Sequence, residues 1–179
     1  MGPMTAMAVL LMTLASPMGI QTSGGRLTFT APPAWKPRPP ASTMRVAEFV
    51  IPRTEGDAED AELIVYYFGT GAGTVDANIE RWIGQMQQPD GSSTKAKAKR
   101  STQTVNGLTV TMVDVSGTYV AEMQPGAAEH FNKPGFRLRA AVVETAHGPY
   151  YIKMTGPAKT MGAADAAFAA FLGSLRFVP

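Results

Sequence analysis

Two stretches of the chain repeat their apolar residues at helical spacing. In residues 74–87 the large apolar side chains recur every three or four positions, at Val75, Ile79, Trp82, Ile83 and Met86. This spacing gives a helix one apolar face that can pack on a core. Residues 160–174 show the same spacing, with alanines between the larger side chains. The pattern therefore predicts two amphipathic helices, and the alanines favour close packing of the second on a sheet.

The remaining apolar positions follow the pattern of β-strands. Residues 61–68 are apolar almost without a break, which is typical of a strand covered on both faces. Residues 95–105 and 108–119 are joined by Asn106-Gly107, a pair that supplies the positive φ of a tight hairpin turn. Further strands are predicted at residues 27–30, 44–51, 136–146 and 150–155. Because hairpins imply mainly antiparallel pairing, we expect an α+β domain. It would have a central sheet of about six or seven strands packed between two helices.

The first 25 residues carry no charged side chain, because the first charged residue of the chain is Arg26. Residues 6–14 are apolar apart from Thr13, and as a helix they would extend only about 14 Å, less than the ~30 Å of a bilayer core. Pro17 and Gly19 end the run. This order is that of a secretory signal peptide, although it lacks a preceding basic residue and an Ala-x-Ala cleavage site. We expect residues 1–25 to be an export leader and residues 26–179 a single domain, with no membrane span once the leader is removed.

Composition limits the kinds of catalytic and metal-binding site that this domain can contain. The chain of 179 residues contains no cysteine and two histidines, and its net charge is only +2. The absence of cysteine excludes disulfides, thiolate metal sites and a cysteine nucleophile. Two histidines are too few for a typical zinc site, and no serine lies in a Gly-x-Ser-x-Gly elbow. We therefore expect no cofactor, no metal, no catalytic residue and no nucleic-acid partner.

Positive side chains gather at three places. Lys95, Lys97 and Lys99 would share one face of a strand, where they could meet an anionic partner or protect a sheet edge. Arg81 precedes Trp82 on the first helix and could pair locally or reach an anion. The third place combines basic and aromatic side chains, and we favour it as a ligand surface. Its residues are His130, Phe131, Lys133, Arg137 and Arg139.

Three segments carry a family resemblance. They are residues 27–35 (LTFTAPPAW), residues 74–91 (TVDANIERWIGQMQQPDG) and residues 150–177, which begin YYIKMTGP and end SLRF. Together they resemble the PsbP-like fold of the extrinsic PsbP proteins of photosystem II, the Mog-type Ran-binding proteins and many secreted bacterial proteins. The resemblance implies an antiparallel sheet between helices and a non-enzymatic role in binding macromolecules. It carries over neither manganese chemistry nor Ran binding, because no residue here matches those functions.

These observations predict an exported, non-catalytic binding or assembly module of the bacterial cell envelope, in the periplasm or outside the cell. Its partner would be a protein or a small anionic ligand. One alternative is a small hydrolase that uses His130 with Glu129 or a nearby serine. Another is an intracellular, cytoplasmic partner-binding protein whose N-terminus has been assigned to the wrong methionine.

Overall fold

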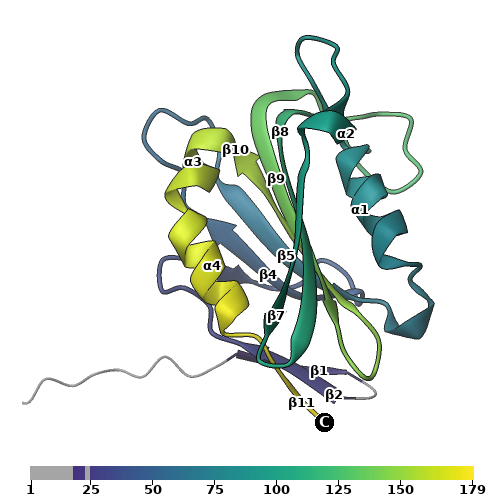
Figure 1. Ribbon diagram of the computed structural model, residues 1–179. Coiled ribbons are helices and arrows are strands. Elements are labelled where there is room, and N and C mark those ends of the chain that lie inside the picture. The colour runs from purple at the N-terminus through teal and green to yellow at the C-terminus, as the bar shows by residue number, and fades with distance from the viewer. Residues whose placement is uncertain (1–17, 23–24) are drawn as a thin grey trace, which may run out of the picture.

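An antiparallel sheet with helices on both faces forms the body of the computed structural model (Figure 1). The structure describes residues 18–22 and 25–179, and within them this sheet has eight strands. Seven are arranged in the order β3-β4-β5-β10-β9-β8-β6, and β7 also pairs with β8. The strands are β3 (Lys36–Arg38), β4 (Arg45–Ile51), β5 (Ala61–Tyr67), β6 (Met86–Gln87), β7 (Lys99–Val105), β8 (Leu108–Tyr119), β9 (Lys133–Glu144) and β10 (Tyr150–Pro157).

A smaller sheet joins the two ends of the described chain. It has the order β1-β2-β11, with β1 at Met18–Thr22, β2 at Gly25–Phe29 and β11 at Arg176–Val178. Figure 1 shows it below the large sheet, beside the C-terminus. Most of the predicted leader lies outside the described residues, namely residues 1–17 and 23–24. Residues 18–22 of that predicted leader form β1, which pairs with β2.

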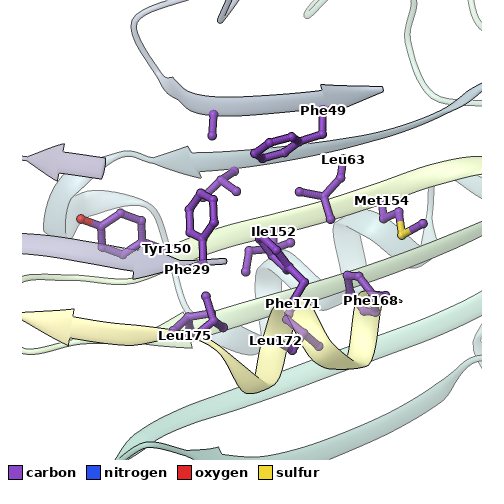
Figure 2. Close-up of a cluster of buried hydrophobic side chains, with 14 of the residues drawn as sticks. Phe29, Phe49, Leu63, Tyr150, Ile152, Met154, Phe168, Phe171, Leu172 and Leu175 are labelled. Atoms are coloured by element: carbon purple, nitrogen blue, oxygen red, sulfur yellow. The ribbon is translucent and has the colours of Figure 1, made fainter. Parts of the chain in front are cut away.

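The larger core lies between the sheet and the C-terminal helices, α3 (Ala158–Ala163) and α4 (Asp165–Gly173). Phe171 of α4 is fully buried, and its ring lies 4.9 Å from that of Phe29 and 5.4 Å from that of Trp35, centroid to centroid. Figure 2 shows the apolar residues of α4 directed at side chains from the neighbouring strands. Trp35 lies within residues 31–40 (APPAWKPRPP), which contain five prolines, and it anchors this segment to the core because its indole is 5% exposed.

Helix α1 (Val75–Ile83) covers part of the opposite face. Thr74 caps it by accepting the Ala77 N–H at 3.1 Å. Its apolar stripe, with Ile79 and Trp82, packs over β8 and β9. The predicted α+β sandwich with a mainly antiparallel sheet is therefore confirmed. The predicted turn also forms, since Asn106 has φ 48° and Gly107 has φ 82°.

Two of the elements predicted from the sequence differ from the elements that the structure shows. Residues 160–174 lie in two helices that meet at Ala164, whose N–H donates to the Thr160 carbonyl at 3.1 Å. The prediction that Lys95, Lys97 and Lys99 form one strand face is wrong. Lys95 and Lys97 belong to a short helix, α2 (Thr94–Lys97), because the preceding serine caps it, and only Lys99 lies in β7.

Candidate functional site

A cavity of about 670 Å³ lies on the sheet face that carries α1. Helix α1 packs over β8 and β9 and leaves the β5 and β10 side of this face uncovered. The cavity is bounded by α1, by strands β5 and β10, and by the loop of residues 120–131. Its volume lies within the range of about 300–1,000 Å³ found for small-molecule sites.

Strand alternation determines which side chains reach the cavity. Leu63 and Val65 of β5 belong to the core on the α4 side, so Ile64 and Tyr66 face the other way and line the cavity. On β10 the same alternation directs Lys153 into it, opposite Ile64 of β5 in the antiparallel register. A lysine therefore lies at the floor of the cavity, on a central strand.

Lys153 has an unusual environment for an ammonium group. Its Nζ donates a hydrogen bond of 2.9 Å to the Tyr119 hydroxyl. Among the residues that the structure describes, no carboxylate lies within ion-pair distance of it. Burial lowers the pKa of Lys153 to about 8; Glu62 opposes the shift, and Arg81 and Arg45 add to it. Burial also raises the pKa of Tyr119, so the phenol stays neutral beside the lysine.

The nearby carboxylates are bound to other arginines. Glu48, 2% exposed, accepts hydrogen bonds from Arg38 at 2.7 Å, Arg45 at 3.1 Å and the Ala41 N–H at 2.7 Å. Burial alone would raise the pKa of Glu48, but these donors outweigh it and the pKa is lowered. Glu62 in turn accepts from Arg38 at 2.5 Å. This cluster occupies both carboxylates and leaves Lys153 without one.

Arg81 is the second cation of the cavity wall that has no carboxylate partner among the described residues. Its guanidinium donates to the Asn78 side-chain oxygen at 2.7 Å. That oxygen is fixed because the Asn78 amide donates to the carbonyls of Ala72 and Thr74, both at 2.9 Å. Arg81 is therefore held by a neutral group at the cavity and keeps its positive charge uncompensated.

Aromatic rings form much of the remaining wall. The rings of Tyr66 and Phe68 stack with centroids 5.7 Å apart, and the Tyr151 ring lies 5.5 Å from that of Phe68. Across the cavity the Tyr119 and Phe131 rings stack at 5.6 Å. Phe68 is 37% exposed, so an apolar surface is open to a ligand.

Gln85 adds an unsatisfied polar group to the wall. Its side-chain oxygen is buried and has no hydrogen-bond partner within the described part of the chain. Buried polar atoms are normally hydrogen-bonded, so this unpaired oxygen is an unusual feature of the cavity wall.

Three of the residues predicted as a binding surface line the cavity, namely Arg81, His130 and Phe131. The other six predicted residues lie elsewhere. Lys133 pairs with Glu59 at 2.7 Å, beside the Phe131 ring. Lys95 pairs with Glu80 at 2.8 Å, and Lys97 and Lys99 are exposed.

Arg137 and Arg139 form a closed ionic network on the opposite face of the sheet. Arg137 donates two hydrogen bonds to Asp114, at 2.8 and 2.6 Å, and Arg139 donates to Asp165 at 2.8 Å. The Arg139 guanidinium also lies 4.5 Å from the centroid of the Phe168 ring. These two arginines bind the sheet to the start of α4, so their charge is already compensated.

His130 does not have the surroundings that a hydrolase would need. Its imidazole is exposed, and its Nδ1 lies 2.8 Å from the Val120 carbonyl oxygen. Within residues 18–22 and 25–179, no serine or carboxylate hydrogen-bonds to this ring. A hydrolytic triad requires both contacts, and neither is made by this imidazole among the described residues.

Lys153 was not among the residues selected from the sequence. The signal was present, since a single lysine interrupts the apolar strand YYIKM at residues 150–154. A charged residue in a buried strand is expected only where it is paired or functional.

No helix in the described part of the chain has the length and apolarity required to cross a bilayer.

Comparisons with known proteins identify the fold. No family model matches the chain, and no curated protein matches its sequence. Among solved structures, LpqN of Mycobacterium tuberculosis, described as involved in cell envelope biogenesis, matches with a TM-score of 0.56 and 11% identity, covering 92% of this chain and 91% of LpqN. The cyanobacterial PsbP (CyanoP) of Synechocystis sp. PCC 6803 matches with a TM-score of 0.54 and 10% identity, and the match covers 99% of this chain and 100% of CyanoP. PA94 of Pseudomonas aeruginosa is a protein of unknown function described as a putative regulator. It matches with a TM-score of 0.52 and 13% identity, and the match covers 91% of this chain and 98% of PA94. The chain therefore has the PsbP-like fold.

Proposed function

We propose that this protein is an exported, non-catalytic module of the bacterial cell envelope that binds a small molecule in the cavity between α1 and β10. The cavity is the observation that carries the proposal. It combines an open aromatic wall with two cations that have no carboxylate partner among the described residues, Lys153 and Arg81, and with the unpaired side-chain oxygen of Gln85. A concave apolar pocket with a few convergent polar groups is the usual form of a ligand site.

The envelope location has separate support. The uncharged residues 6–14, apolar apart from Thr13, have the length of the apolar region of an export signal. A structural neighbour, LpqN, is described as involved in cell envelope biogenesis. Mass spectrometry of the protein from fractionated native cells tests the location. A chain shortened at its N-terminus in the envelope fraction supports export, and an intact Met1 in the cytosol contradicts it.

Binding can be tested with a neutral aromatic probe, N-phenyl-1-naphthylamine. We expect a fluorescence increase that saturates at one probe per chain, and NMR shifts confined to amides of β5, β10 and the loop of residues 120–131. Phe68→Ser should weaken binding roughly tenfold, because it removes an exposed ring from the wall. Met44→Ser is the matched control, since Met44 is 53% exposed and lies outside the cavity. If the probe does not bind, or if its shifts spread over the α4 face, the cavity is not a ligand site.

A further inference from the structure

We propose that the ligand is an amphiphilic organic anion whose acidic group lies between Lys153 and Arg81 and whose apolar part lies against the aromatic wall. This inference rests on the proposed function, because it names the chemical class of the small molecule that the cavity binds. The acidic group can be a carboxylate or a phosphate, since both accept hydrogen bonds from ammonium and guanidinium donors.

The charges of the cavity favour an anion. Glu48 and Glu62 are held by Arg38 and Arg45, with hydrogen bonds of 2.5–3.1 Å. Glu122, the other acidic side chain of the wall, accepts the Gly126 N–H at 2.7 Å within its own loop. Glu122 has no cationic partner, but Lys153 and Arg81 both lack a carboxylate partner among the described residues. The unpaired charges of the wall therefore sum to a positive value.

Because it is desolvated, Lys153 should attract an anion more strongly than Arg81 does. A buried ammonium without a counter-ion is unfavourable, and Lys153 has only a neutral phenol as its hydrogen-bond partner. An entering anion would supply the missing charge in a place that water screens poorly. Arg81 is exposed at the cavity and can reorient toward the same group, because one amide oxygen holds it.

The apolar part of the ligand is indicated by the rings that surround this charge. Tyr66, Phe68 and Tyr151 form one wall, with neighbouring centroids 5.5–5.7 Å apart. Met123, on the loop that borders the cavity, is 49% exposed. A fully ionic ligand such as a bare phosphate would leave these surfaces in water, so the fit is to an anion with an attached apolar or aromatic group.

Binding should weaken as Lys153 loses its proton. With a pKa of about 8, the charged fraction falls from about nine tenths at pH 7 to about one tenth at pH 9. The affinity for an anion should therefore fall about tenfold over this interval. The other titratable or charged groups that face Lys153 come from β4, β5, α1, β8 and the loop of residues 120–131. They are Arg45, Glu62, Tyr66, Arg81, Tyr119, Glu122 and His130, and Tyr151 of β10 itself also lines the cavity.

A matched pair of dyes tests the inference. 8-Anilinonaphthalene-1-sulfonate is N-phenyl-1-naphthylamine with a sulfonate added, so the two probes differ in one negative charge. We expect the full-length protein to bind the sulfonate roughly tenfold or more tightly than the neutral dye at pH 7. Lys153→Met should remove this preference while leaving the neutral dye within about twofold. Arg81→Gln changes an exposed residue and should reduce the preference partially. Lys97→Met, an exposed lysine outside the cavity, should not change it.

Competition against the bound sulfonate dye shows whether the acidic group of the ligand is a carboxylate or a phosphate. Displacement by 4-phenylbutyrate supports a carboxylate ligand, and displacement by phenyl phosphate supports a phosphate ligand. Displacement by neither overturns the inference. Equal affinity for the two dyes, or a sulfonate preference that survives in Lys153→Met and from pH 7 to pH 9, also overturns it. In that case the neutral dye still reports binding, so the proposed function stands. If neither dye binds, both proposals fail.

Discussion

Replacing Lys153 with methionine should stabilise the protein at neutral pH and change how its stability depends on pH. In the folded state burial lowers the pKa of Lys153 from 10.5 to about 8. In the unfolded chain the lysine is solvated and keeps its ordinary pKa. Below pH 8 the fold must therefore hold a desolvated ammonium, whereas above pH 10.5 the lysine is neutral in both states.

The size of the effect follows from this difference. Each pKa unit is worth about 1.4 kcal/mol, so a change from 10.5 to about 8 corresponds to about 3 kcal/mol. Because the folded protein binds fewer protons between these values, its free energy of unfolding should rise with pH across that window. The Lys153 side chain keeps partial exposure to the cavity, so about 3 kcal/mol is an upper value. Methionine has a similar length and no charge, so it removes the penalty and the pH dependence together.

Urea denaturation at half-unit steps from pH 7 to pH 10.5 measures this effect. The difference between Lys153→Met and the wild-type protein cancels the titration of other lysines and tyrosines. We expect the variant to be more stable by up to about 3 kcal/mol at pH 7, with the two curves converging as pH rises. Lys97→Met is the control and should run parallel to wild type, because Lys97 is exposed. Two parallel curves for Lys153→Met would refute the argument that Lys153 is desolvated.

Further predictions concern the fold that positions the cavity. Glu48→Gln should lower the free energy of unfolding by about 1.5–3 kcal/mol at pH 7, because it weakens charged hydrogen bonds in a buried site. Because the folded pKa of Glu48 is lowered, this difference should shrink as pH falls below 4.5, as monitored by urea denaturation. Gly156→Ala should destabilise the fold by about 1–3 kcal/mol, because the added Cβ would overlap Ala61. Gly162→Ala should stabilise the fold by up to about 1 kcal/mol, because the added Cβ meets open space in α3. Thermal unfolding measures both changes. Phe171→Ala should cost about 3–5 kcal/mol by the same assay, and a smaller loss would show that the ring is not a centre of the core.

The layered fold could be predicted from the sequence because its signals are local. The spacing of Ile79 and Trp82 defines the buried face of α1, and Asn106-Gly107 forms the turn that its composition demands. The failure at Lys95 and Lys97 is also local. Lysines two apart suit one face of a strand, but the cap that Ser93 provides, accepting the Ala96 N–H at 3.3 Å, begins a helical turn instead.

The candidate site could be predicted only in part because it is assembled from distant segments. Arg81, His130 and Phe131 were selected for local basic or aromatic character, and they line the cavity. A single lysine in an apolar strand is a local signal for Lys153, but the sequence does not show its partner, because the Tyr119 hydroxyl to which it donates lies 34 residues away. The prediction grouped Arg137 with His130, but alternation along β9 directs that arginine to the α4 face, toward Asp165.

Stability and binding together separate a structural lysine from a functional one. A structural lysine would make an ion pair, and its loss would weaken the fold. Lys153 has no such pair among the described residues, and Glu48 and Glu62 of the neighbouring strands β4 and β5 are held by Arg38 and Arg45. Removing its charge should therefore strengthen the fold and weaken anion binding, two effects of opposite sign from one substitution. Opposed changes of this kind are typical of sites where function requires a group that the folded state alone disfavours. A variant that lost both stability and binding would instead place Lys153 in the framework of the sheet.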